Sequence, residues 1–165
     1  MRGRNSGESV GQARLYADGR FPTPSGKARF VKTEHQPLAE PTTAEYPLSL
    51  LSGRLRDQWH GMSRTGTVPR LFNPEDEPLL HMSPKDMKPL GLKTGDLARV
   101  RSPRGSLVAR VIGDGAFRGR VWLPMHWGNR FMNGAGANTF TPGACDPYSA
   151  QPELKHAAVA VEAAE

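Results

Sequence analysis

Short apolar runs separated by polar, turn-rich segments make up most of the chain after residue 45. In the stretch 97–101, Leu97 and Arg99 lie on one face of an extended chain. Ala98 and Val100 lie on the other face, which is the two-residue period of a strand. Short strands joined by long loops predict a mainly β chain folded as a small β-barrel. The predicted strands are Tyr46–Leu51, Pro78–Met82, Leu97–Arg101, Leu107–Ile112, Arg120–Leu123 and Ala157–Val161.

One short helix is predicted to follow the second strand. Ser83 can cap its first turn, Pro84 suits the first helical position, and Asp86 favours the positive end of the helix dipole. Gly91 is expected to end the helix after about two turns, and Pro89 can shorten it.

The first 45 residues differ in character from the rest. They are polar and interrupted by proline, so residues 1–45 are predicted to be an N-terminal tail or linker. Within it, Arg14–Phe30 can form a pair of strands, because Asp18-Gly19 and Pro24-Ser25-Gly26 are turn signals. Residues 46–165 are predicted to form the barrel domain.

Composition and charge narrow the function only in part. The 165 residues suffice for one domain, and 22 Lys and Arg against 16 Asp and Glu give a net charge of +6. A basic surface suits a nucleic acid, an acidic protein or a phosphorylated cofactor, or it is simply a soluble basic face. No apolar run approaches the roughly 18 residues of a membrane span, and no secretory signal is visible. We therefore expect a cytoplasmic protein without a membrane partner.

Several kinds of chemistry lack the residues they need. Cys145 is the single cysteine, which excludes an internal disulfide and a site built from cysteines alone. The five histidines lack metal-site spacing, and neither a phosphate-cradling Gly-rich loop nor a Gly-x-Ser-x-Gly elbow is present. No catalytic residue and no metal ligand is therefore assigned.

The long polar loop after the first strand carries most of the candidate binding chemistry. Gly53 lets the backbone approach a ligand closely, and arginines bind phosphate through a planar fork of donors. Trp59 offers an aromatic face to a heterocycle. The alternative is a solvated basic loop with Trp59 packed into the core. The candidates here are Ser52, Gly53, Arg54, Leu55, Arg56, Asp57, Gln58, Trp59, His60, Gly61, Ser63 and Arg64.

A second segment, Trp122–Gly128, runs from a strand end into a cluster of rings. It can deliver His126 and Trp127 to an edge of the barrel. The favoured interpretation is a plug of packed aromatic side chains in which His126 is satisfied internally.

A third segment adds polar side chains near the end of the chain. Asn138, Ser149 and Lys155 sit in or beside a loop restrained by Pro147 and Pro152. Alone, this is an ordinary turn-rich connection. Three such segments in one small barrel indicate a ligand that is polar, anionic and contains rings.

Together these residues resemble the C-terminal domain of molybdenum oxidoreductases of the dimethyl-sulfoxide-reductase family, and most closely that of assimilatory nitrate reductases. Ser52-Gly53-Arg54 followed by Trp59-His60 is similar to the family's Thr-Gly-Arg and Trp-His motif. Met82–Asp96 resembles its helix-and-turn segment, and Asp146–Lys155 its closing motif. The resemblance covers most of Arg14–Val161 and implies a double-psi β-barrel with one or two short helices and long ligand-binding loops.

The resemblance also implies a cofactor and a reaction. Residues 52–61, Asn138 and Lys155 are expected to contact molybdopterin guanine dinucleotide in an enzyme that reduces nitrate to nitrite. The family's iron–sulfur cysteines and molybdenum ligand lie in upstream domains, which are expected to hold the metal and the cluster. The chain is thus expected to be an excised domain, a gene fragment or a split subunit. Its expected partners are the other domains or subunits of the enzyme, and it is not expected to be catalytic alone.

Two other functions are considered. One is a cofactor-binding subunit of an enzyme like formate or formylmethanofuran dehydrogenase. The other is a small basic barrel that binds nucleic acid, for which aromatic and basic residues should alternate along strands. Here they cluster in loops, which lowers the weight of that interpretation.

Overall fold

The computed structural model describes residues 14–72, 75–115, 117–132 and 134–164 of the chain, which divides into two compact units. The first unit, residues 1–36, is described from Arg14 onward, and its first residues lie outside the described part. Turns form where the sequence predicts them, with Gly19 N donating to Tyr16 O at 3.0 Å and Gly26 N to Thr23 O at 2.9 Å. The described residues 14–36 contain no strand, so the possible strand pair is not formed there.

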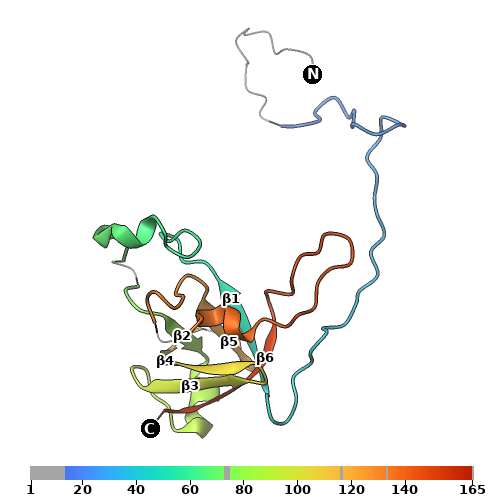
Figure 1. The fold of residues 1–165 in the computed structure, drawn as a ribbon. Helices are drawn as coiled ribbons and strands as arrows, with labels where there is room; N and C mark the ends of the chain where they lie inside the picture. Colours follow the sequence, from blue (N-terminus) through green and yellow to red (C-terminus); the bar gives the residue numbers. More distant parts are fainter. Residues whose placement is uncertain (1–13, 73–74, 116, 133, 165) are drawn as a thin grey trace. The chain divides into compact units, whose positions relative to one another are not determined.

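The second unit, residues 37–165, is a closed barrel (Figure 1). Its strands lie in the order β1-β5-β2-β4-β3-β6 around the barrel. Within the described residues, no helix is long and apolar enough to cross a membrane. The elements are β1 (Leu48–Gly53), η1 (Thr65–Thr67), η2 (Pro69–Phe72), β2 (Leu79–Met82), α1 (Pro84–Met87), η3 (Lys88–Leu90), β3 (Leu97–Ser102), β4 (Gly105–Gly113), β5 (Arg120–Pro124), η4 (Gly136–Phe140) and β6 (Ala157–Ala163), where η denotes a 3₁₀ helix.

Strand pairing brings distant parts of the chain together at one end of the barrel. β1 runs parallel to β5, and the register places Gly53 beside Pro124. β2 and β4 form a second parallel pair, and the other neighbours are antiparallel. The predicted mainly β fold, a double-psi β-barrel, is confirmed. Because β1 and β5 end side by side, the long loop after Gly53 and the segment after Pro124 leave the barrel together.

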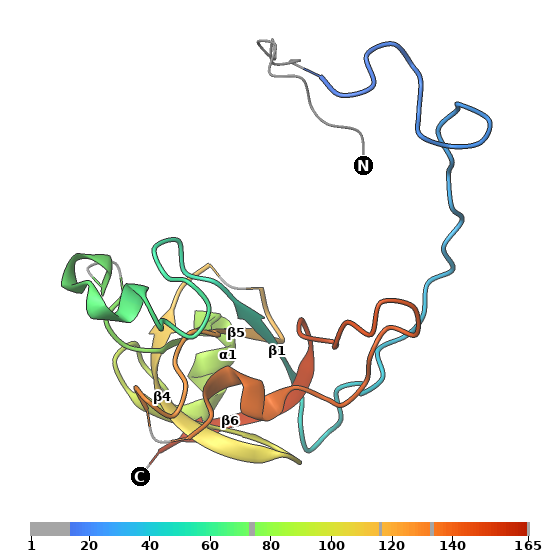
Figure 2. The same ribbon diagram turned by 45° about the horizontal axis from the view of Figure 1, so that its top comes forward.

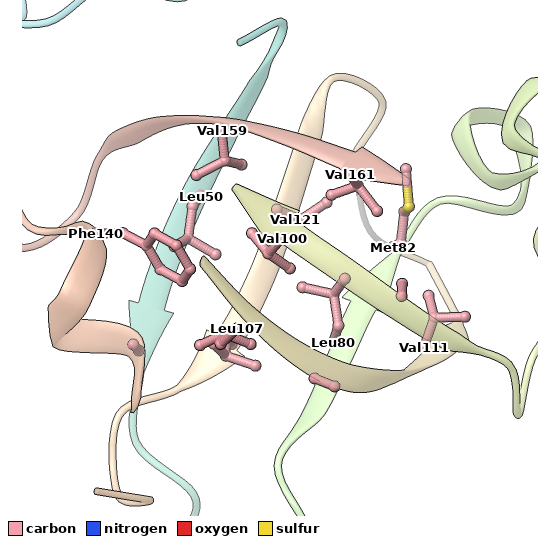
Figure 3. Close-up of a cluster of buried hydrophobic side chains, with 14 of the residues drawn as sticks. Leu50, Leu80, Met82, Val100, Leu107, Val111, Val121, Phe140, Val159 and Val161 are labelled. Atoms are coloured by element: carbon pink, nitrogen blue, oxygen red, sulfur yellow. The ribbon is translucent and has the colours of Figure 1, made fainter. Parts of the chain in front are cut away.

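The barrel interior is filled by one cluster of apolar side chains (Figure 3). They come from alternate positions of the strands, as in β4, where every second residue is buried. Full burial of one such side chain contributes about 1.5–3 kcal/mol to folding. Phe140 of η4 closes the cluster from outside the sheet. The most deeply buried members include Leu80, Met82, Val100, Val111, Val121, Leu123, Phe140 and Val159.

The predicted helix is present and ends at Gly91, but only its first turn is α-helical. Ser83 caps it by accepting a hydrogen bond from Lys85 N at 3.3 Å. α1 spans four residues and continues as the 3₁₀ turn η3, which contains Pro89, a residue without an N–H to extend an α-helix. Gly91 ends the turn in the left-handed region at φ 69°.

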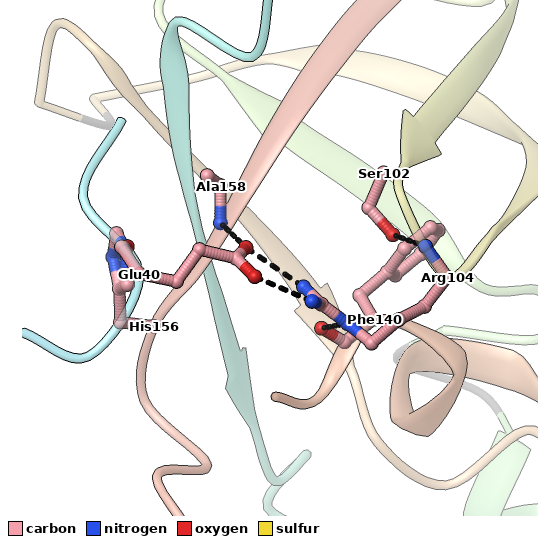
Figure 4. A network of polar contacts seen from close by, with 6 residues as sticks. All are labelled: Glu40, Ser102, Arg104, Phe140, His156 and Ala158. Atoms are coloured by element: carbon pink, nitrogen blue, oxygen red, sulfur yellow. Dashed lines mark hydrogen bonds and ion pairs between the residues drawn. The ribbon is translucent and has the colours of Figure 1, made fainter. Parts of the chain in front are cut away.

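Residues before β1 are attached to the barrel by a polar network around Glu40 (Figure 4). The Glu40 carboxylate accepts hydrogen bonds from both terminal nitrogens of Arg104 and from Ala158 N. Its backbone oxygen accepts one from His156 Nε2 at 2.6 Å. Arg104 Nε in turn donates to Phe140 O at 2.9 Å. The network thus joins the segment before β1 to β6, to η4 and to the β3–β4 turn.

Candidate functional site

The loop that follows β1 starts from a tightly packed point. A Cβ added at Gly53 would lie 2.3 Å from Trp122 Nε1, so the indole of β5 occupies the space that any side chain would need. Gly53 was expected to allow close approach of a ligand, but here the group that approaches it is Trp122. Gly53 O accepts a hydrogen bond from Met125 N at 2.9 Å, which continues the parallel pairing past the strand ends.

His126 holds this loop at two points. Its Nε2 accepts a hydrogen bond from Leu55 N at 2.9 Å, and its Nδ1 contacts His60 O at 2.5 Å. His126 is fully buried. The sequence-based interpretation that His126 is satisfied internally in a packed plug agrees with these contacts. What the sequence did not indicate is that its partners belong to the candidate binding loop.

The middle of the loop is anchored by Met62 rather than by Trp59. Met62 is fully buried, whereas Trp59 is 53% exposed and therefore available to a ligand. The rings of Trp59 and His60 are nearly perpendicular with their centres 4.5 Å apart, and the guanidinium of Arg54 lies 5.4 Å from the centre of the Trp59 ring. The sequence also allowed Trp59 to pack into the core, but in the structure it does not.

The cations of the loop are not equivalent. Arg56 donates two hydrogen bonds to the Asp57 carboxylate, at 2.9 and 2.8 Å. These hydrogen bonds lower the pKa of Asp57 and raise the pKa of Arg56, so both side chains of the pair stay ionised. Arg54 and Arg64 are exposed and have no ion pair within the described part of the chain. These two are free to bind an anion.

A hollow of about 240 Å³ adjoins the loop and is lined in part by Gln58. Gln58 is buried, and its Nε2 donates to Leu71 O at 2.9 Å. Its Oε1 has no hydrogen-bond partner among the described residues. A buried acceptor without a partner is costly, so a ligand that donates an N–H group would relieve that cost. The other lining residues are Leu55, Arg56, Asp57, Leu71 and Glu75.

The closing segment of the chain meets the start of the loop directly. Ser52 Oγ donates to Leu154 O at 2.7 Å, and Lys155 Nζ donates to Ser52 O at 2.6 Å. Lys155 remains exposed, so its ammonium has further donors for a ligand. Two segments about a hundred residues apart, both selected from sequence, are therefore brought together.

Asn138 lies on η4, close to the same corner. It is exposed, and its neighbour Ala137 lines one small cavity together with Ser52 and Leu154. η4 can approach the barrel because Gly136, at φ 68°, has no side chain to strike Trp127 O.

The remaining candidates lie in open positions. Gly61 has no atom within 4 Å of the place of a Cβ, and Ser63 is exposed. Ser149 is held within its own hairpin, where its N and Oγ donate to Asp146 Oδ1 at 2.7 and 2.9 Å. Those bonds lower the pKa of Asp146. The segment between η4 and β6, which contains this hairpin, extends away from the barrel strands (Figure 2).

The donors at this end of the barrel fit a phosphate-bearing ligand with a ring. Exposed Arg54, Arg64 and Lys155 supply charge-assisted donors, Trp59 supplies a ring face, and Gln58 supplies a buried acceptor. Among the described residues, no group of three or more His, Cys, Asp and Glu is arranged to hold a metal ion.

Comparison with known proteins agrees with this chemistry. A family described as "Molydopterin dinucleotide binding domain" matches residues 48–158. A nitrate reductase of Klebsiella oxytoca is 49% identical over 137 residues, which are 82% of this chain and 16% of that protein. A nitrate reductase of a Synechocystis strain is 40% identical over 151 residues, or 88% of this chain and 21% of that protein. The chain thus spans about a fifth of the length of these relatives.

The fold agrees as well. Acetylene hydratase from Pelobacter acetylenicus superposes with a TM-score of 0.60 at 22% identity, over 73% of this chain and 19% of that chain. At that identity the likeness concerns the fold alone. The family match covers most of the barrel, from the start of β1 into β6. The chain therefore belongs to the molybdopterin dinucleotide-binding domain family.

Proposed function

We propose that this chain is the C-terminal domain of a molybdenum-dependent nitrate reductase and binds its molybdopterin guanine dinucleotide. The reaction of the whole enzyme is the reduction of nitrate to nitrite. Two relatives that cover more than four fifths of the chain are nitrate reductases, which supports this substrate. They favour it over a formate or formylmethanofuran dehydrogenase-like enzyme and over a nucleic-acid-binding barrel. We further propose that the enzyme serves nitrate assimilation in the cytoplasm.

The observation that carries the proposal is the hydrogen bond from Lys155 Nζ to Ser52 O. It brings Lys155 to the start of the loop that exposes two arginines and Trp59. In the bound enzyme the metal centre supplies the two-electron chemistry, whereas this chain binds and orients the dinucleotide. Arg54, Arg64 and Lys155 bind phosphate oxygens, and Trp59 packs against a ring. The other proposed contacts are Ser52, Gly53, Leu55, Arg56, Asp57, Gln58, His60, Gly61, Ser63, Asn138 and Ser149.

The partners follow from the same proposal. An enzyme of this kind has further domains or subunits that hold the molybdenum and an iron–sulfur cluster. The isolated chain is expected to bind the nucleotide end of the cofactor weakly, because much of the pocket belongs to those partners and the loops must order on binding. It is not expected to reduce nitrate by itself.

NMR mapping with guanosine diphosphate tests the proposal. Shifts are expected to concentrate at residues 52–61, Asn138 and Lys155. Each of Arg54→Ala and Lys155→Ala should weaken binding about tenfold or more, since each removes a charge-assisted bond worth roughly 1.5–3 kcal/mol. The same titration with a short single-stranded DNA at matched ionic strength serves as the comparison.

A matched control comes from the other end of the barrel. Lys88 lies on η3, which directly follows α1. In α1, Asp86 Oδ2 accepts a hydrogen bond from Gly119 N, which precedes the first residue of β5. The loop that carries Arg54 leaves β1 beside the opposite end of β5. Lys88→Ala removes the same charge and should leave the affinity unchanged. If DNA shifts spread along residues 97–112 and 118–123 and the nucleotide produces none, the proposal is wrong.

A further inference from the structure

We propose that His126 is a positioning residue that holds the 54–61 loop in the shape that binds the dinucleotide. The proposal rests on the proposed function and adds a residue that has no expected contact with the cofactor. His126 follows β5, whereas the loop follows β1, so the contact joins the two segments that leave the parallel strand pair.

The two hydrogen bonds require one protonation state of the ring. Leu55 N can only donate, so Nε2 of His126 must carry a lone pair. His60 O can only accept, so Nδ1 must carry the proton. The neutral imidazole with its proton on Nδ1 satisfies both, whereas the imidazolium and the other neutral form do not.

The surroundings favour that neutral state. Burial is the largest cause that lowers the pKa of His126, and the charge of Arg54 lowers it further. The hydrogen bond to His60 O acts in the opposite direction. The charged and titratable groups that face the ring are Arg54 and His60, both from the loop that the ring holds.

The loop needs an external support because its backbone is unfavourable. His60 at φ 45° and Met62 at φ 58° are non-glycine residues in the left-handed region. His126 bonds to the carbonyl of one of them, and full burial fixes the side chain of the other. Without the two bonds to His126, Leu55 N and His60 O lose these partners at the two ends of the segment.

The two bonded groups lie next to the side chains that are proposed to bind the cofactor. Leu55 N follows Arg54 in the chain, and His60 O follows Trp59. The Arg54 and Trp59 side chains also contact each other, with the Arg54 guanidinium 5.4 Å from the centre of the Trp59 ring. A loop that must first be ordered binds its ligand more weakly than one that is already in shape. His126 therefore raises affinity without touching the ligand.

Three measurements on the full chain test the proposal. In the unchanged chain, the ¹⁵N shifts of the imidazole should identify Nδ1 of His126 as the protonated nitrogen near neutral pH. His126→Phe keeps a buried ring without nitrogens; it should speed amide exchange at Leu55 at least tenfold and weaken guanosine diphosphate binding about tenfold. His126→Gln supplies one acceptor and one donor and should recover part of both losses.

Controls separate positioning from simple loss of structure. Methyl spectra of core residues such as Val100 and Val159 report whether the barrel is intact, and His35→Gln changes an exposed histidine of the first unit. Unchanged nucleotide affinity in His126→Phe, despite faster exchange at Leu55, would overturn the proposal. So would a proton found on Nε2. If His126→Phe does not fold, His126→Gln and the imidazole shifts decide.

The proposed function can fail separately. If the unchanged chain binds no guanosine diphosphate, the cofactor assignment is contradicted. In that case the imidazole shifts and the exchange at Leu55 still show whether His126 holds the loop. If the hydrogen bonds of His126 to Leu55 and His60 are lost and nucleotide binding is retained, only the role of His126 is contradicted.

Discussion

Gly136→Ala is expected to lower the free energy of unfolding by about 3–5 kcal/mol, the largest effect of any substitution considered for this chain. A Cβ at this position would lie 1.8 Å from Trp127 O and 3.0 Å from its carbonyl carbon. These are backbone atoms of a buried residue, so they cannot move aside as a flexible side chain can. The left-handed φ of 68° adds about 1–2 kcal/mol for any L side chain. Urea unfolding followed by tryptophan fluorescence measures the loss.

Two other glycines separate these contributions. Gly91 has nearly the same φ, 69°, but nothing within 4 Å of the Cβ position, so Gly91→Ala should cost only the conformational part. Gly143 has open space and no left-handed φ, so Gly143→Ala should change stability by less than about 0.5 kcal/mol. Equal losses at Gly136 and Gly91 would show that the contact with Trp127 carries no energy.

The contact between Gly136 and Trp127 also affects the proposed binding site. Gly136 begins η4, which carries Asn138, and Trp127 directly follows His126. Displacement of η4 from Trp127 would therefore disturb the Asn138 position and the segment that holds the 54–61 loop. We expect reduced nucleotide binding in Gly136→Ala even at temperatures at which the barrel remains folded.

The strands could be predicted from sequence because their signal is local. Alternation of buried and exposed positions is visible in 97–101 and 107–112, and both were placed within two residues of their observed ends. The helix start at Ser83 is also a local signal and was correct. The helical segment ends at Gly91 after about two turns, as predicted, and its second turn is the 3₁₀ turn η3, which contains Pro89.

For the candidate site, the sequence indicates which residue types could bind a ligand but not which contacts those residues make within the protein. The loop motif, Asn138 and Lys155 are recognisable as residue types in sequence. The contact of Gly53 with Trp122 and the hydrogen bonds of His126 depend on the parallel register of β1 and β5. A parallel pair forms between strands far apart in sequence and leaves no local signal. Burial of Met62 within a polar loop was likewise invisible.

The segment before β1 shows the same limit. Glu40 lies in a stretch whose polarity and prolines predicted a linker, and nothing around it indicates a partner at Arg104. In the structure its carboxylate joins β6 and the β3–β4 turn (Figure 4). The contact is specific, because the guanidinium presents two parallel donors to the two carboxylate oxygens.

Glu40→Ala is expected to lower the free energy of unfolding by about 3 kcal/mol near neutral pH. The change removes both hydrogen bonds from Arg104 and leaves Ala158 N without its acceptor. Among the residues that the structure describes, Phe140 O would be the one remaining partner of the Arg104 guanidinium. The side chains of Glu40 and Arg104 are 25% and 27% exposed, so the pair is screened less than a surface ion pair and more than a fully buried one.

The contribution of the Glu40 charge depends on pH in a defined direction. The hydrogen bond from Arg104 is the largest cause that lowers the pKa of Glu40 below its ordinary value of 4.5. A carboxyl group with a lowered pKa in the folded state stabilises that state above its ordinary pKa. The stabilisation is lost as the pH falls through the lowered value. Glu40→Gln keeps the shape and an acceptor oxygen but has no charge to titrate, so it isolates this effect.

The measurement compares the unchanged chain with Glu40→Gln in urea unfolding at several pH values. Near pH 7 the unchanged chain should be more stable by about 1.5 kcal/mol, and the difference should shrink toward zero as the pH falls below the ordinary pKa of a glutamate. Glu34→Gln is the control. The side chain of Glu34 is 70% exposed and that of its ion-pair partner Lys32 is 87% exposed, so this pair should contribute little to stability. A difference between the unchanged chain and Glu40→Gln that stays constant across this range would contradict the ion pair with Arg104. Contacts of the Glu40 side chain other than charge would then hold the segment before β1 against the barrel.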